Sequence, residues 1–76
     1  MDPSEPAAVR RAIEQHLAEY PHAADSAAGV ARWWVEARGV HASADSVQRV
    51  LAELVAAGAV RQVALADGTV LYSKGR

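Results

Sequence analysis

The sequence contains no cysteine and no long apolar segment, and each absence removes a class of protein. Without cysteine there are no disulfides, no thiolate zinc sites and no cysteine nucleophiles. No apolar run approaches the roughly 20 residues that a membrane-spanning helix requires. The opening residues, MDPSEP, lack the basic start and apolar stretch of a signal peptide. We therefore expect a cytoplasmic protein with no membrane partner.

An excess of positive charge is also missing. Eight Lys and Arg stand against nine Asp and Glu, which gives a formal net charge of −1 and an isoelectric point near 6.3. A domain that spreads a basic face over phosphates has an isoelectric point above about 9. Nucleic-acid binding would therefore have to depend on a local cluster of cations.

Motifs for catalysis and for cofactors are absent as well. The chain has no glycine-rich phosphate loop, no G-x-S-x-G turn and no metal motif. His16 falls on the apolar stripe of a helix, whereas His22 and His41 lie in separate loops without the spacing of zinc ligands. The segment from His22 to Ser26 contains the residue types of a catalytic triad, but neighbouring loop positions do not converge by themselves. The sequence predicts a non-enzymatic protein with no metal and no cofactor.

The length allows a single domain, residues 1–76. A chain this short buries only about 60% of its unfolded surface. Alanine supplies 18 of the apolar residues, so ten Val and five Leu must do most of the packing. The small core predicts modest stability and leaves a homodimer as an open alternative.

Three helices are predicted, at about 5–20, 26–37 and 43–57. Each has a candidate N-cap and a residue that ends it; the caps are Ser4, Asp25 or Ser26, and Ser43, and the ends are Pro21, Gly39 and Gly58.

Each helix has one apolar stripe at the 3.6-residue period. The expected buried residues are Val9, Ile13, His16, Leu17 and Tyr20, then Ala27, Val30, Ala31 and Trp34, then Val47, Val50, Leu51, Leu54 and Val55. One core is expected to hold Trp34, Leu51, Leu54 and Tyr72. Trp33 falls at a boundary, where it either covers the edge of the core or stays partly exposed to a partner.

A two-stranded hairpin is predicted at about 60–74. Asp67-Gly68 is a preferred pair for a two-residue type I′ turn, in which both residues have positive φ. The resulting register pairs Ala66 with Thr69, Leu65 with Val70, Val63 with Tyr72 and Arg61 with Lys74. It predicts that Val63, Leu65, Val70 and Tyr72 cover the helices, that Arg61 and Lys74 are neighbours, and that Leu71 is on the other side.

Residues 43–60, S-A-D-S-V-Q-R-V-L-A-E-L-V-A-A-G-A-V, are followed by a strand, D-G and a strand with V-L-Y. This pattern resembles the third helix and wing of bacterial winged-helix domains, and the resemblance covers residues 26–74. It implies an α+β, mostly α, fold: a three-helix winged helix with a C-terminal two-stranded β-hairpin wing. It also implies binding to double-stranded DNA through the third helix and the wing, often as a dimer, although many members bind proteins instead.

The leading hypothesis is a small DNA-binding transcription regulator, and the alternative is a protein-interaction module. Under the first, the contacting residues are Ser43, Ser46, Gln48, Arg49, Arg61, Lys74 and Arg76, with Gln48 and Arg49 reading bases. Asp45 at the start of the third helix and Asp67 at the wing tip depart from the DNA-binding pattern. Under the second, the contacting residues are Trp33, Leu71, Ala52 and Ala56, the two alanines permitting close approach of a partner helix.

Overall fold

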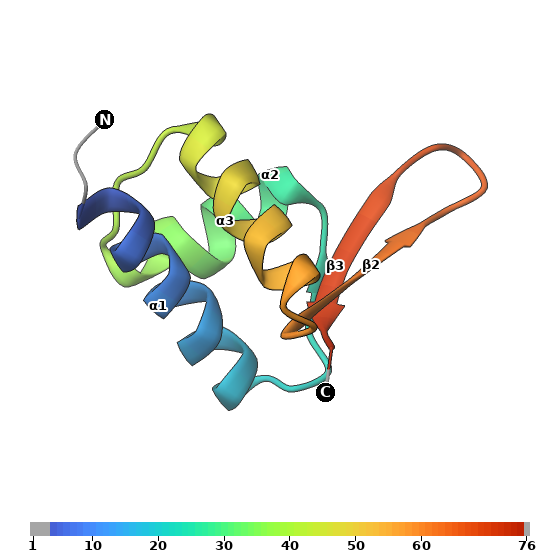
Figure 1. The fold of residues 1–76 in the computed structure, drawn as a ribbon, viewed down its shortest axis with the longest axis horizontal. Coiled ribbons are helices and arrows are strands. Elements are labelled where there is room, and N and C mark those ends of the chain that lie inside the picture. Colours follow the sequence, from blue (N-terminus) through green and yellow to red (C-terminus); the bar gives the residue numbers. More distant parts are fainter. Residues whose placement is uncertain (1–3, 76) are drawn as a thin grey trace.

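The computed structural model describes residues 4–75 and has the predicted winged-helix layout (Figure 1). Its elements in chain order are α1 (Ser4–Glu19), β1 (Ala24–Asp25), α2 (Ala27–Gly29), η1 (Val30–Val35), η2 (Glu36–Arg38), α3 (Ala44–Ala56), β2 (Val60–Ala64) and β3 (Val70–Lys74). The short elements α2, η1 and η2 follow one another without a break and form the second helical segment. The α+β fold class, mostly helical with a C-terminal hairpin, is therefore confirmed.

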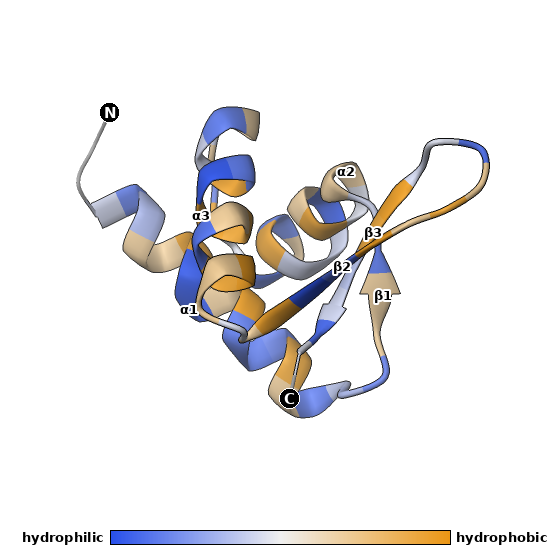
Figure 2. Cartoon of the chain, turned by 45° about the vertical axis from the view of Figure 1, so that its right-hand side comes forward, coloured by the Kyte–Doolittle hydropathy of each residue, from blue (hydrophilic) through white to orange (hydrophobic). Residues whose placement is uncertain are grey.

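One core joins all three helical segments to the base of the hairpin. Its buried apolar residues are Val9, Ala12, Ile13, Leu17, Val30, Trp34, Val35, Val47, Val50, Leu51, Leu54, Val60 and Tyr72. Hydrophobic and hydrophilic residues alternate along each helix, as expected for helices with one buried face (Figure 2). The predicted common core of Trp34, Leu51, Leu54 and Tyr72 is confirmed.

The N-caps and the terminating glycines of α3 and of the second helical segment are as predicted. The Ser43 hydroxyl accepts the Ser46 N–H at 3.1 Å, and the Ser26 hydroxyl accepts the Gly29 N–H at 3.2 Å. Gly39 and Gly58 end these helices in the left-handed conformation, with φ of 79° and 80°.

The ends of α1 differ from the prediction. Ser4 is already part of α1, so it is not the residue that precedes the helix as a cap. The helix ends at Glu19, because a residue before proline disfavours the helical conformation and Pro21 follows directly after Tyr20. Tyr20 was expected on the buried stripe, but the chain leaves the helix there and 57% of the side chain is exposed.

The middle part of the second helical segment, η1, winds more widely than an α-helix. The Glu36 N–H donates to the Ala31 carbonyl, five residues back, as in a π-helix. In an α-helix, a residue five positions on would point roughly 140° away, whereas here Val30, Trp34 and Val35 are all buried. The wider turn thus adds Val35 to the core, which the sequence period did not predict. Trp33 stays 59% exposed, as in the second of the two predicted alternatives.

The sheet has three antiparallel strands in the order β1-β3-β2. Strand β1 lies in a segment that was expected to be a connecting loop. It pairs Ala24 with Ser73 and Asp25 with Tyr72. A two-residue strand has no sequence period of its own, so its formation depends on the distant β3.

The hairpin turn is not the predicted type I′ turn. Such a turn needs two residues with positive φ, but Gly68 has a φ of 91° and no non-glycine residue in 4–75 has a positive one. The Leu65 N–H donates to the Thr69 carbonyl at 2.7 Å, which encloses a three-residue loop, and the Asp67 carboxylate accepts the Thr69 N–H at 2.9 Å. Asp67 therefore supports the turn with its side chain, at a negative φ.

The longer loop shifts the strand register by one residue. The pairs are Val60 with Lys74, Arg61 with Ser73, Gln62 with Tyr72, Val63 with Leu71 and Ala64 with Val70. A slip of one residue exchanges the two faces of a strand. The predictions that Val63 and Leu65 cover the helices, and that Arg61 and Lys74 are neighbours, are therefore wrong.

Candidate binding surfaces

The outward face of the hairpin carries apolar side chains. We call this surface the outer wing face and define it by Val63, Leu65 and Leu71. Val63 and Leu65 are each 43% exposed and Leu71 is partly buried. Figure 2 shows hydrophobic stretches on both strands as they project from the helices. The predicted register placed Val63 and Leu65 on the other face, because it was derived from a two-residue turn that is not formed.

Strand β2 also leaves one edge open. It pairs only with β3, and no other strand among residues 4–75 lies beyond it. An edge strand presents unpaired backbone N–H and C=O groups to its surroundings. The open edge of β2 and the outer wing face therefore adjoin one another along the same strand.

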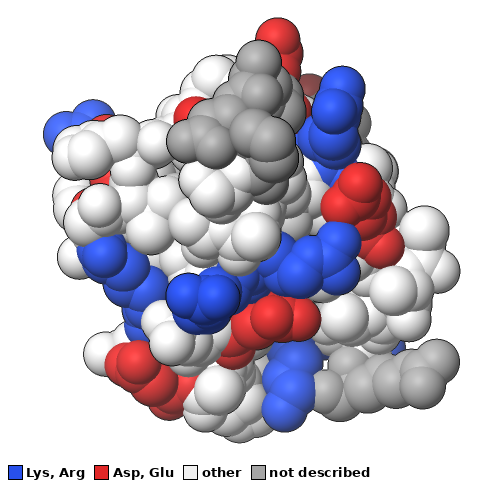
Figure 3. Space-filling view, turned by 60° about the vertical axis from the view of Figure 1, so that its left-hand side comes forward, with Lys and Arg blue, Asp and Glu red and all other residues white. Residues whose placement is uncertain are grey.

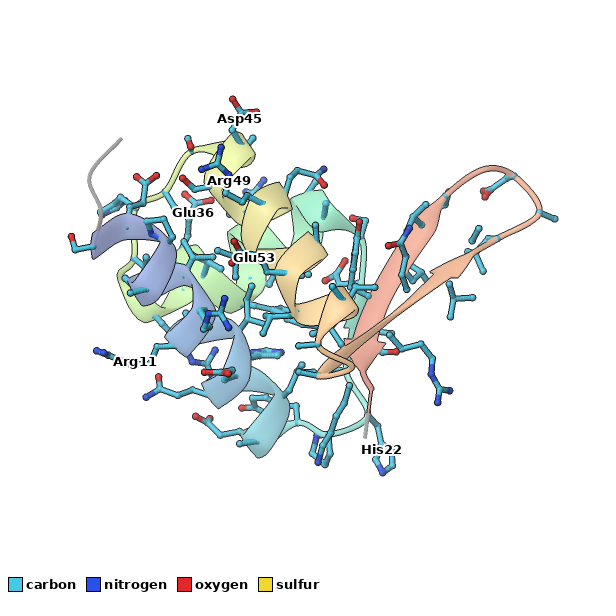
Figure 4. All side chains as sticks on the ribbon, in the orientation of Figure 1. Arg11, His22, Glu36, Asp45, Arg49 and Glu53 are labelled. Atoms are coloured by element: carbon cyan, nitrogen blue, oxygen red, sulfur yellow. The ribbon has the colours of Figure 1, made fainter. Side chains whose placement is uncertain are left out.

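The outward face of α3 is balanced in charge. Arg49 stands four residues after Asp45 and four before Glu53, so the three side chains follow one another along the helix (Figure 4). Glu53 in turn forms an ion pair with Arg10 of α1, at 2.8 Å. Acidic and basic groups are likewise interleaved on the side of the molecule seen in Figure 3. The outward face of α3 therefore has no excess of positive charge.

Ser46 was predicted to contact phosphate, and this prediction is wrong because the residue is fully buried. Its hydroxyl donates a hydrogen bond to the Glu5 carboxylate of α1 and accepts one from the Ser43 hydroxyl at 3.1 Å. Ser46, Val50 and Leu54 follow one another at intervals of four residues, which places Ser46 in the buried stripe of α3. The sequence therefore contained the information that Ser46 is buried.

The other predicted DNA contacts do not form one surface. Ser43 uses its hydroxyl to cap α3. Arg61 faces outward on β2, whereas Lys74 pairs with Val60 and lies on the other face of the sheet from Arg61. Arg76 lies outside the described residues. Only Gln48 and Arg49 remain exposed together on the outward face of α3.

The residues predicted for a protein interface belong to three elements. Ala52 and Ala56 are exposed on α3, Trp33 is exposed in η1, and Leu71 belongs to the outer wing face.

A pocket of about 640 Å³ lies where α1 ends and β1 begins. Five aromatic rings and two carboxylates are part of its lining: His16, Tyr20, His22, Trp33, Trp34, Glu19 and Asp25. His22 is at the opposite end of the molecule from Asp45 (Figure 4). The pocket is thus distant from the first turn of α3.

His16 is held in the wall of this pocket. Its ring stacks on Trp34 with 4.6 Å between centroids, and its Nδ1 accepts a hydrogen bond from Arg38 at 2.9 Å. Burial lowers the pKa of His16, and the neighbouring Arg38 lowers it further, while Glu19 and Asp25 act in the opposite direction. The net effect lowers the pKa and favours the neutral imidazole.

His22 and His41 are exposed, and no group of three or more His, Asp or Glu side chains within residues 4–75 could hold a metal ion. Nor does this part of the chain contain a helix long and apolar enough to cross a membrane.

No protein-family model matches the chain, and neither a curated protein nor a solved structure matches it. The choice of function therefore depends on the surfaces of the chain itself.

Proposed function

We propose that the chain is a cytoplasmic member of the winged-helix family that binds another protein through its outer wing face. The supporting observation is the outward exposure of Val63 and Leu65 beside Leu71. Isolated apolar side chains on a surface are ordinary, but contiguous ones mark interaction sites. The partner that fits is an extended segment with alternating apolar residues.

The open edge of β2 supports this choice of partner. An extended segment that pairs with an edge strand gains main-chain hydrogen bonds, and every second side chain of that segment lies on one face of the enlarged sheet. On β2 that face would continue the outer wing face past Val63 and Leu65. Affinity would come from the backbone pairing, and specificity from the apolar contacts.

The charge balance of α3 favours a protein over DNA. Duplex DNA carries one negative charge for about every 1.7 Å of its axis. A groove-bound α3 would bring Asp45 and Glu53 toward that charge together with Arg49. A protein partner imposes no such repulsion.

A DNA-binding regulator is the second candidate, and one observation favours it. Gln48 and Arg49 are exposed next to each other on α3. Gln pairs well with adenine and Arg with guanine in the major groove, each contributing about 1–3 kcal/mol of discrimination if bidentate.

A peptide library displayed on phage tests the first proposal, with the intact chain as bait. We expect selected peptides to alternate apolar and polar residues and to shift the amide resonances of residues 60–65. Leu65→Ser should cost about 2 kcal/mol or more of peptide affinity, as expected for a central contact. Arg49→Ala is the matched control on α3 and should bind the peptides like the parent chain.

Duplex titrations at about 50 mM and 200 mM salt test the second candidate. If DNA is the partner, binding tightens well beyond about 10⁻⁴ M at the lower salt, and Arg49→Ala weakens it. That result, together with selected peptides that ignore Leu65→Ser, would refute the protein-binding proposal.

A further inference from the structure

The chain exposes two large aromatic side chains, and both line the same pocket. Tyr20 is 57% exposed and Trp33 is 59% exposed, although Tyr20 follows α1 and Trp33 belongs to η1. The buried Trp34 and the partly buried His16 also line this pocket. Aromatic rings from two distant parts of the sequence thus face one space.

The charges in the pocket lining are negative. Glu19 and Asp25 contribute carboxylates, and neither Lys nor Arg is part of the lining. Asp25 is held in place because its Oδ1 accepts the Ser26 N–H at 2.9 Å. Its carboxylate also lies so close to Gly29 that a Cβ there would be 1.8 Å from it.

Two arginines outside the lining contact residues that belong to it. Arg38 donates to Glu19 at 3.1 Å and to His16, which leaves Glu19 partly neutralised. The guanidinium of Arg32 lies 5.2 Å from the centroid of a Trp33 ring. That distance is within the roughly 6 Å at which the face of an indole attracts a cation. The Trp33 ring therefore already binds one cationic group from its own chain.

We propose that this pocket binds an organic cation, namely an alkylated ammonium group. Ring faces attract such a cation through their quadrupole, and the carboxylates of Glu19 and Asp25 supply the opposite charge. The volume of about 640 Å³ is within the range of small-molecule sites, about 300–1,000 Å³. This site shares no residue with the outer wing face, so it goes beyond the proposed protein-binding function.

The test uses choline and its neutral isostere 3,3-dimethyl-1-butanol, which has the same shape without the charge. In NMR titrations of the intact chain, choline should shift the Trp33 indole N–H resonance. It should bind at least about tenfold more tightly than the isostere, a difference of about 1.4 kcal/mol. Equal binding of the two compounds, or no shift with choline, would overturn the proposal.

Variants of the two exposed rings locate the site. Trp33→Leu and Tyr20→Leu should each weaken choline binding by about tenfold, which is within the range of one cation–π contact. Both side chains are largely exposed, so the fold should persist, and circular dichroism checks this. Leu65→Ser on the outer wing face is the matched control; loss of choline binding in this variant instead would contradict the assignment.

Peptides distinguish the two sources of an alkylated ammonium group. A short peptide with trimethyl-lysine should bind more tightly than choline if the natural ligand is a protein side chain, and no more tightly if it is a free small molecule. The same peptide with unmodified lysine is the control and should bind more weakly than the methylated form, because the compact ammonium is more strongly hydrated. If it binds as tightly, alkylation is not recognised and the proposal is wrong.

Discussion

The helical body, residues 4–56, and the wing, residues 60–74, place their aliphatic side chains differently. Within the body, every Val, Leu and Ile is buried or partly buried. In the wing, Val60 and Tyr72 at its base are buried, Val70 and Leu71 are partly buried, and Val63 and Leu65 are exposed. Free energy of folding is therefore concentrated in the body and the base of the wing. The rest of the wing can bind or open locally without unfolding the domain.

The largest expected contrast between the two regions is in the free energy of unfolding. Leu51→Ala should lose about 2–5 kcal/mol, because it empties space in the core. Leu65→Ala should stay within about 0.5 kcal/mol of the parent chain, as is usual for surface changes. Urea denaturation of both variants measures this. Similar losses would show that Leu65 packs against the body in solution.

A smaller contrast concerns the two left-handed glycines Gly39 and Gly68. An added Cβ meets nothing within 4 Å at either position, so the strain comes from the backbone alone, with φ of 79° and 91°. Substitution by alanine should cost about 1–2 kcal/mol at each site.

The two costs should appear in different measurements. Gly39→Ala should lower global stability, because Gly39 ends a helix of the body. Gly68→Ala should mainly speed hydrogen exchange of the hairpin amides, and urea denaturation should change less. An unchanged exchange rate in Gly68→Ala would contradict the three-residue turn.

His16 in the helical body should make the free energy of unfolding depend on pH. Its folded pKa is below the ordinary 6.5, first because of burial and then because of Arg38. The unfolded chain therefore takes up the proton more readily, and stability is complete above the unfolded pKa and is lost as pH falls through the folded one. The urea midpoint of unfolding should fall as the pH is lowered from about 8 to about 5. His16→Gln should make the midpoint less dependent on pH. An identical pH dependence in the variant would exclude His16 as its source.

The smallest expected effect is at the tip of the wing, where the Thr69 backbone N–H lowers the pKa of Asp67 below its ordinary 3.8. This contribution is present above the unfolded pKa and is lost as pH falls through the folded one. An NMR titration of the Asp67 carboxyl carbon should give a midpoint below 3.8 in the folded chain and the ordinary value in concentrated urea. A folded midpoint at or above 3.8 would show that the hydrogen bond from Thr69 is not made.

The candidate surfaces could be predicted only in part. The exposure of Gln48, Arg49, Ala52 and Ala56 follows from the helical period of α3, because these side chains point away from the apolar stripe. The sequence left the exposure of Trp33 open, and the pocket around it was not predicted. The pocket depends on where α1 ends and on the pairing of β1 with β3, which are long-range outcomes.

The sequence by itself determined α3 and the ends of the second helical segment, because the signals for them are local. The Ser43 cap, the apolar period and the left-handed Gly58 all act within a few residues. Tertiary structure decided the π-helical winding that buries Val35, the strand β1 and the register of the wing. The sequence pattern is compatible with more than one arrangement at each of these places, and contacts with distant residues select among them. The one-residue shift in register is decisive, since it turns Val60 into the core and leaves Val63 and Leu65 on the surface.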